Sequence, residues 1–216
     1  MTVVGIAGCT ALMTAGFGIK NSIESLIHNQ YGELIHYDSV ATFTDGVTQE
    51  DMDTLEGDLS ADGHIDDFLL NCGYSDDVKS SEDTETAEYV IVDDKNAFKD
   101  YVTLRTRRKH NDVVLGDSGV VITEKLSKDL GVKKGDKITV TSSAGKHAEA
   151  VVSGITEMYV NHYVYISTEY YNELFGNIPE HNRVLIKISG DVSETESYMG
   201  DEYLSRDYIK GVSFLN

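Results

Sequence analysis

Tryptophan is absent from this 216-residue sequence, and cysteine and proline are nearly absent. The two cysteines, Cys9 and Cys72, are too few for a disulfide framework and do not have metal-ligand spacing. The single proline, Pro179, stands alone, and no glycine-rich stretch marks a long linker. The sequence also contains no internal repeat. Disulfide-stapled, zinc-finger and repeat architectures are therefore excluded.

Positive charge is scarce. Lys and Arg total 18 against 37 Asp and Glu, which gives a formal net charge of -19. Recognition of phosphates requires a basic surface, so nucleic acid is excluded as the principal partner. Direct adsorption of the main domain onto anionic lipid is disfavoured for the same reason. The acidity instead favours solubility and reduces self-association.

Motifs for common catalytic sites are missing as well. The sequence has no G-x-S-x-G, no H-E-x-x-H, no phosphate-binding glycine loop and no G-x-G-x-x-G. Seven histidines are scattered without metal-ligand spacing: His28, His36, His64, His110, His147, His162 and His181. We therefore predict no catalytic residues, no cofactor site and no enzymatic activity in this chain.

The longest uncharged segment stands at the start of the chain. Residues 3–19 are 17 uncharged residues, which is the lower limit for a helix that crosses the hydrocarbon core of a bilayer. A core helix should show a polar face, but only Thr10 and Thr14 have polar side chains here. A signal peptide should begin with a basic region, but only Met1 and Thr2 precede the run. We therefore favour the end of a truncated membrane helix over a core helix or a signal peptide.

The first half of the remaining chain predicts a helix followed by strands. Apolar residues in 20–34 recur near the 3.6-residue period, and this helix joins the apolar run without a breaker. Thr48 is a good N-cap for a helix over residues 49–59, with Asp51 completing a variant capping box. Strands are expected at residues 35–44, 67–73 and 89–92.

Residues 58–69 resemble an EF-hand calcium loop without its last ligand. Oxygen-bearing side chains occupy the first, third, fifth and ninth positions, namely Asp58, Ser60, Asp62 and Asp66. The twelfth position, which should be a bidentate carboxylate, is Leu69. The alternative is a plain turn between a helix and a strand in an acidic protein. We expect no metal site, and calcium binding at these four residues is the weaker alternative.

The sign of the charge changes in the middle of the chain. Residues 74–88 are polar and acidic and predict a solvated loop or a short edge strand. A basic cluster follows, with Arg105, Arg107, Arg108 and Lys109. This cluster could dock an acidic partner or an acidic face of the same protein, or form a solvated hairpin tip. We favour the hairpin tip.

The second half of the chain alternates short strands with glycine turns. Strands are expected at residues 119–122, 137–142, 147–155, 163–167 and 183–189, and helices at 124–130, 168–175 and 194–204. This spacing predicts a small, curled antiparallel sheet. The aromatic run at residues 158–165, with Tyr170 and Tyr171, is either a binding surface or a set of core residues, and we favour the core.

The order of these segments resembles a known family. GIAGCTALMTAGFGIKNSI is similar to the end of the first membrane helix of FtsX-like ABC transporter permeases, in the form common in Gram-positive bacteria. DSGVVITEKLSKDLGVKKGDKITV and VSGITEMYVNHYVYISTEYYNELFG resemble the body of the extracytoplasmic domain of that family. LRTRR and GVSFLN also resemble it. The resemblance covers nearly the whole chain.

The resemblance implies an α+β fold similar to the MacB-type periplasmic core. An α+β lobe formed by both chain ends would carry an inserted, smaller β-rich lobe. The expected divisions are 1–19 for the end of a truncated transmembrane helix, 20–100 plus 183–216 for the first lobe, and 101–182 for the inserted lobe. The family offers no catalytic residues that could be carried over to this chain.

The resemblance also implies a function. The domain would lie on the extracellular face of the cell membrane, attached through flanking helices. It would couple cytoplasmic ATP hydrolysis, in a separate ABC ATPase subunit or domain, to export or to an extracellular lipoprotein, peptide or cell-wall partner. A second permease copy would complete a dimer. The alternative is a secreted calcium-dependent binding module, in which case Asp58→Ala and Asp62→Ala should abolish a calcium-dependent gain in thermal stability.

Overall fold

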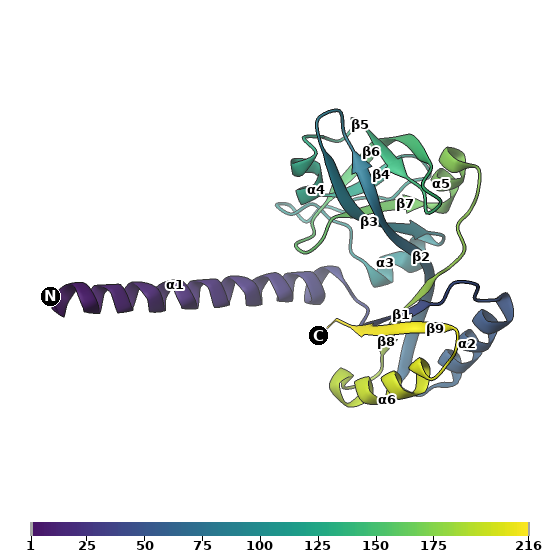
Figure 1. Ribbon diagram of the computed structural model, residues 1–216, viewed down its shortest axis with the longest axis horizontal. Helices are drawn as coiled ribbons and strands as arrows, with labels where there is room; N and C mark the ends of the chain where they lie inside the picture. The colour runs from purple at the N-terminus through teal and green to yellow at the C-terminus, as the bar shows by residue number, and fades with distance from the viewer. Residues whose placement is uncertain (1, 216) are drawn as a thin grey trace.

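A long helix extends from a two-part body (Figure 1). The structure is a computed structural model that describes the backbone of residues 2–215 and the side chains of residues 15–192 and 194–215. Its helices are α1 (Thr2–His28), η1 (Asn29–Leu34), α2 (Gln49–Ala61), α3 (Lys95–Tyr101), α4 (Glu124–Asp129), α5 (Thr168–Phe175) and α6 (Val192–Leu204). Its strands are β1 (Ser39–Phe43), β2 (Ile65–Lys79), β3 (Thr84–Val92), β4 (Val120–Thr123), β5 (Lys137–Thr141), β6 (His147–Thr156), β7 (Tyr163–Ser167), β8 (Arg183–Ile188) and β9 (Ile209–Phe214).

The first part of the body is a closed barrel. Its strands follow one another in the order β2-β3-β7-β4-β6-β5, and Lys79 of β2 pairs with Thr139 of β5 to close the ring. The pairs β3–β7 and β4–β6 are parallel, so the expected antiparallel sheet is only partly correct. The difference arises because segments distant in the sequence, rather than hairpin neighbours, provide these pairs.

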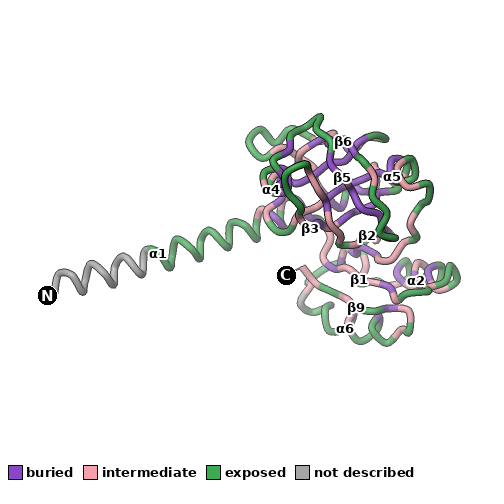
Figure 2. The backbone as a smooth tube through the Cα atoms, turned by 45° about the horizontal axis from the view of Figure 1, so that its top comes forward, coloured by how far each residue is buried: buried purple, intermediate pink, exposed green. Residues whose placement is uncertain are grey.

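The barrel interior is filled by alternating side chains of its strands. In β3, for example, Tyr89 and Ile91 point inward, while Val90 and Val92 pack outside against another part of the body. Helices α4 and α5 add Leu126, Leu130, Tyr170 and Tyr171 to the interior core. The thiol of Cys72 is buried in this core, and burial raises its pKa to about 11, so it is an unreactive packing residue. Figure 2 shows the buried residues gathered in this part of the molecule.

The second part, here called the terminal sheet, joins both ends of the chain. It has the antiparallel order β9-β1-β8-β2, in which only the first half of β2 takes part. Helices α2 and α6 cover one face and bury Leu55, Leu59, Met199 and Tyr203 against it. The N-terminus of α2 has the predicted capping box, because the Thr48 and Asp51 side chains each accept a bond from the backbone of the other residue.

Strand β2 belongs to both parts. Residues up to Asn71 pair with β8, and residues from Cys72 onward pair with β3. Strand residues 72–79 and 84–92 therefore pair within the barrel, whereas the expected boundary near residue 100 placed them with the chain ends. The acidic residues 74–88, expected as a solvated loop or a short edge strand, lie mostly in β2 and β3, because these strands bury Val78 and Ala87 in the barrel core.

Helix α1 continues without interruption into η1, as expected from the sequence. Its residues 15–28 are exposed, and Figure 2 shows this part of the helix standing clear of the body. Within the part of the chain whose side chains are described, no helix combines the length and the apolar character needed to cross a bilayer. Most of the predicted membrane segment, residues 1–14 of 1–19, lies outside those described side chains.

Closure of the barrel depends on side-chain hydrogen bonds as well as on strand pairing. The Tyr89 hydroxyl donates to the Asp77 carbonyl at 2.9 Å and accepts from the Thr141 N–H at 3.1 Å, which links β3 to β2 and β5. The Thr141 hydroxyl also donates to the Asp77 carbonyl at 2.8 Å. These bonds reinforce the seam where β2 and β5 share a single pair of residues.

We predict that Tyr89→Phe lowers the free energy of unfolding by about 1–2 kcal/mol, because the buried Thr141 N–H loses its acceptor. Chemical denaturation measures this loss. The matched control is Tyr198→Phe, because Tyr198 is 40% exposed and its hydroxyl bonds to Asp62 at the surface. Equal stability of the Tyr89→Phe variant and the parent chain would contradict this account of closure.

Candidate functional site

The end of α1 meets the body at a compact junction. We call residues 29–35, which comprise η1 and Ile35, the helix foot. The foot widens into a π-helical turn, a geometry that occurs often at functional positions. It closes with the Ile35 N–H donating to the Gln30 carbonyl at 2.9 Å, and the chain then runs directly into β1. Any displacement of α1 must therefore pass through this turn before it reaches the body.

A network of charged side chains fixes the helix foot to the barrel. The Arg105 guanidinium donates to Glu33 of the foot at 2.5 Å and to Glu157, just after β6, at 2.8 Å. The Arg105 side chain is 14% exposed, and that of Glu157 is 2% exposed. The hydrogen bond from Arg105 holds the pKa of Glu33 below its usual value, and the bond to Glu33 raises the pKa of Arg105. Both partners therefore stay charged at neutral pH.

The backbone of Arg105 is held as firmly as its side chain. Its N–H donates to the Thr156 hydroxyl at 3.0 Å, and its carbonyl accepts from the Glu157 N–H at 2.7 Å. The guanidinium therefore projects from a segment hydrogen-bonded to the end of β6. This pre-positioning reduces the conformational entropy that Arg105 loses when it binds Glu33.

Neutral polar groups form a second layer of the junction. The buried Gln30 side-chain oxygen accepts from the Tyr159 N–H at 2.9 Å and from the Val160 N–H at 3.3 Å. The Tyr159 hydroxyl donates to Glu157 and accepts a long bond from Asn29. The Arg107 guanidinium lies 5.1 Å from the centre of the Tyr159 ring. Residues 157–160, which follow β6, therefore bind the helix foot through both backbone N–H groups and side chains.

Apolar contacts complete the attachment. Leu34 and Ile35 are buried in a core that also contains Tyr165 of β7 and Leu185 of β8. The Thr103 N–H donates to the Leu34 carbonyl at 2.8 Å, and Ile35 forms a β-bridge with Val102. The helix foot thus contacts the barrel wall and the uncovered face of the terminal sheet at the same time.

The basic cluster divides into two roles. Arg105 is inside the junction, where it binds acidic groups of the same protein. Arg107, Arg108 and Lys109 form the exposed tip of a hairpin closed by the Arg105–Asp112 bridge, as favoured from the sequence. Each of the two interpretations is therefore correct for part of the cluster.

The aromatic run is mostly core, as expected. Tyr171 is buried in the barrel interior. Tyr165 and Met158 are buried in the core that contains Leu34 and Leu185. Tyr159 is the exception, because its ring and hydroxyl belong to the helix-foot junction.

The predicted calcium-loop residues are only partly brought together. Asp58 pairs with Arg206, and Asp62 accepts hydrogen bonds from Tyr203 and Tyr198 at 2.8 and 3.1 Å. Burial alone would raise the pKa of Asp62, but bonds from the His64 backbone and Tyr203 lower it below its ordinary value. The Ser60 hydroxyl donates instead to the Glu56 carbonyl, and Asp66 is exposed on β2.

One oxygen of Asp58 therefore already binds Arg206, and both oxygens of Asp62 accept hydrogen bonds. Among the described residues, no group of three or more His, Cys, Asp or Glu side chains is arranged to hold a metal ion. Calcium binding by this segment stays the weaker alternative to the expectation of no metal site.

Sequence reasoning did not single out Asn29, Gln30, Glu33 or Glu157. Each of them is an ordinary polar residue in a helix or a turn, and no local motif marks it. The available signal was Arg105 itself, because a basic residue in a chain of net charge -19 has many carboxylates to pair with.

Comparison with known proteins identifies the class of this domain. The family of MacB-like periplasmic core domains matches residues 2–197. The periplasmic region of MacB from Actinobacillus actinomycetemcomitans is 13% identical with a TM-score of 0.47, over 84% of this chain and 90% of that one. The extracellular domain of the noncanonic ABC-type transporter YknZ from Gram-positive bacteria is 11% identical with a TM-score of 0.45, over 83% and 99%. Among curated proteins, none matches the chain significantly.

The chain belongs to the MacB-like periplasmic core domain family, because the match spans most of its length. Its class is therefore that of MacB-like periplasmic core domains, and its mixed helices and strands form an α+β fold. The family and the α+β fold class expected from the sequence are both confirmed.

We predict that Arg105→Gln lowers the free energy of unfolding by about 3–5 kcal/mol, because Glu157 is then left as a buried, unpaired charge. Adding Glu157→Gln should restore part of the loss, because it removes that charge. Denaturant titration of the single and double variants measures both effects. The control is Lys137→Gln, which breaks an exposed pair with Glu149 and should change stability little. A double variant less stable than Arg105→Gln would contradict the unpaired-charge explanation.

Proposed function

We propose that this domain couples movement of its N-terminal helix, driven by cytoplasmic ATP hydrolysis, to a change in the extracellular body. The observation that supports the proposal most strongly is the helix foot. A single continuous helix ends in a junction that binds the barrel through Arg105 and then continues into β1 of the terminal sheet. A displacement of the helix would thus act on both parts of the body together.

The mechanical properties of α1 suit this role. All backbone hydrogen bonds of an α-helix are internal to the segment, so a continuous helix resists bending along its length. The exposed part of α1 makes no contact with the body before the foot, as its exposure and Figure 1 indicate. Tilting of the far end of α1 would therefore move the helix foot.

The body suits the role because its two parts share few chain connections. Strand β2 and the segment leading into β8 cross between them at Asn71–Cys72 and at Asn182–Arg183. We propose that the barrel, residues 72–182, and the terminal sheet, residues 35–71 and 183–215, are the two lobes that move. This division replaces the boundary near residue 100 that the sequence suggested.

The proposal includes partners and a location. The energy would come from a separate ABC ATPase subunit or domain, and a second permease copy would provide the opposing half of a dimer. The domain would lie on the extracellular face of the cell membrane, with residues 1–19 as the end of a membrane helix. Strand β9 ends near the helix foot (Figure 1). This position supports the proposal that both chain ends attach the same side of the body to the membrane. The output would be export or the activation of an extracellular lipoprotein, peptide or cell-wall partner.

We predict that Lys20→Gly with Asn21→Gly uncouples the body from ATP hydrolysis in the full-length permease with its ATPase. Two glycines weaken the helix by about 2 kcal/mol relative to two alanines, which makes a flexible point between the far end and the foot. Amide hydrogen exchange at residues 102–106, compared between nucleotide-free and vanadate-trapped complexes, measures the response. The Thr103 N–H is a direct reporter because it bonds to the Leu34 carbonyl.

The matched control replaces the same two residues with alanine, which removes the same side chains but preserves the helix. The alanine pair should keep both ATP hydrolysis and the exchange response. The glycine pair should keep hydrolysis and lose the response. If the glycine pair transmits the response as well as the alanine pair, then α1 does not act as a lever.

A further inference from the structure

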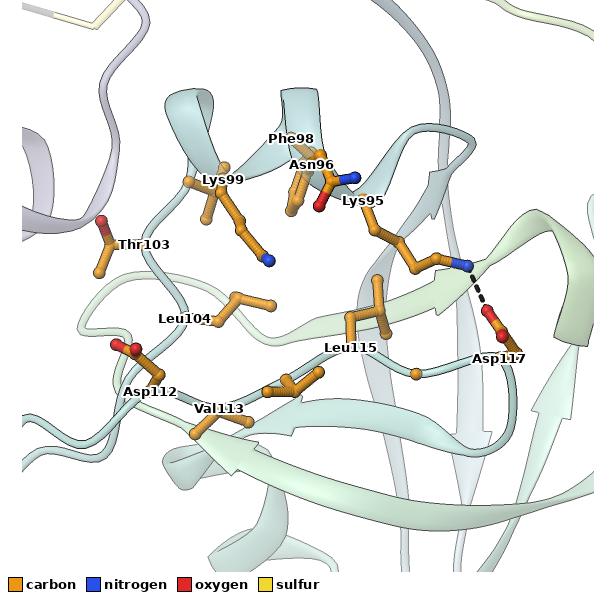
Figure 3. A pocket seen from close by; sticks show the side chains of 13 residues that line it. Lys95, Asn96, Phe98, Lys99, Thr103, Leu104, Asp112, Val113, Leu115 and Asp117 are labelled. Atoms are coloured by element: carbon orange, nitrogen blue, oxygen red, sulfur yellow. Dashed lines mark hydrogen bonds and ion pairs between the residues drawn. The ribbon is translucent and has the colours of Figure 1, made fainter.

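A cavity of about 520 Å³ lies between α3 and the segment that leads into β4. Figure 3 shows it with its lining side chains. The volume is within the range of pockets that hold small molecules. The calcium-loop residues and the charged side chains of the helix-foot network do not line it. We call it the Lys99 pocket.

The floor of the Lys99 pocket is apolar. Phe98, Val102 and Leu115 line the cavity, and their side chains are buried in the same core as Leu34 and Leu185. Leu104 and Val113 are half-buried beside them, and their backbones pair through a 2.9 Å hydrogen bond. Val114 also lines the cavity although it is 70% exposed. An apolar group of a ligand placed here would remove this surface from water.

The two lysines of the pocket differ in their partners. Lys95 is bound to Asp117 and lies 3.0 Å from Glu169, so its charge is already compensated. Lys99 has no ion-pair partner among the residues that the structure describes. In Figure 3 its ammonium points into the middle of the cavity, toward Leu104 and Leu115. A free cation therefore faces an apolar floor, in a protein where carboxylates outnumber cationic side chains two to one.

We propose that the Lys99 pocket binds a carboxylate carried on an apolar chain. The ammonium of Lys99 would pair with the carboxylate, and the floor would take the chain. The charge balance favours a single negative charge, because one ammonium is free and the carboxylate of Asp112, which also lines the cavity, would repel a dianion. Fatty carboxylates and the C-termini of peptides that end in apolar residues both have this chemistry.

The position of the pocket gives such a ligand a route to the helix foot. Residues 102–104 line the cavity and, on their other side, hold the foot through the Val102–Ile35 bridge and the Thr103–Leu34 hydrogen bond. A ligand that orders this segment would also order the attachment of α1. Binding itself does not depend on the coupling proposed above and is tested separately on the 216-residue chain.

The test uses two pairs of probes. Octanoate is compared with octan-1-ol, and N-acetyl-Leu-Phe with a free carboxylate is compared with its C-terminal amide. Methyl chemical shifts of Val114, Leu104 and Leu115 in the folded chain report occupancy during titration. We expect at least one of the two acids to bind with a Kd below about 1 mM, and its neutral analogue to bind about tenfold more weakly.

Variants of Lys99 test the ion pair. Lys99→Gln should weaken binding of the acid about tenfold and leave the neutral analogue unchanged, whereas Lys99→Arg should retain most of the affinity. The control is Lys128→Gln, because Lys128 of α4 is exposed, as Lys99 is, but lies outside the pocket. Val114→Asp should weaken all probes by placing a carboxylate on the apolar wall.

Binding of octanoate alone would identify the ligand as a free amphiphile, and binding of the peptide acid alone would identify it as a peptide C-terminus. Either result supports the proposal. The proposal is wrong if neither acid binds below about 1 mM, if the shift changes lie outside the pocket, or if Lys99→Gln binds the acid as tightly as the parent chain.

Discussion

The shared strand β2 is the constraint on which the rest of this structure depends. A strand hydrogen-bonds along both of its edges, so one continuous strand can belong to two sheets only if its partners change along its length. That change falls between Asn71 and Cys72, where pairing passes from β8 to β3. Gly73 lies beside this point, and a Cβ there would overlap the Arg183 guanidinium, which binds Asn71 and Glu88. A side chain at position 73 would therefore displace the Arg183 guanidinium from its bonds to Asn71 and Glu88.

The helix foot and the Lys99 pocket both follow from this arrangement. Because β2 holds the terminal sheet against the barrel wall, the core that contains Leu34 and Leu185 forms between them. Residues 102–105 leave that core in an extended conformation, with Arg105 directed at the foot and Leu104 directed at the pocket. One short segment thus serves the attachment of α1 on one side and an open apolar cavity on the other.

Local structure was largely predictable from the sequence. The Thr48 capping box, the helix that begins after Ser167 and the strands with dense apolar residues are set by interactions within a few positions. The Ser167 hydroxyl indeed accepts from the Tyr170 N–H. Thr123 also occupies the N-cap position of α4, but its side chain makes no capping bond and instead accepts a long hydrogen bond from the Tyr163 N–H. A partner distant in the sequence changed the role of that hydroxyl.

Long-range features were less predictable for the same reason. In residues 74–88, Tyr74, Val78 and Ala87 alone supply the apolar side of two strands, and the acidic side chains around them obscured the alternation. Nothing near Gln30 indicates that it binds the Tyr159 N–H, and nothing near Glu157 indicates that it pairs with Arg105. These groups are brought together only when the barrel and the helix foot assemble. The family resemblance supplied the two-lobed architecture, but the place where β2 changes partners became visible only in the strand pairing.

The pairing of β1 with both β8 and β9 sets the order in which this chain can fold. Ser39 lies opposite Phe214, so the terminal sheet cannot be completed until nearly the whole chain is available. The barrel, in contrast, uses a contiguous segment and can form while the last strands are still being delivered. Its formation brings Asn71 next to Arg183 and thereby shortens the effective loop that the later sheet must close. As the chain emerges stepwise during synthesis, the barrel is thus the template on which the two ends of the chain pair last.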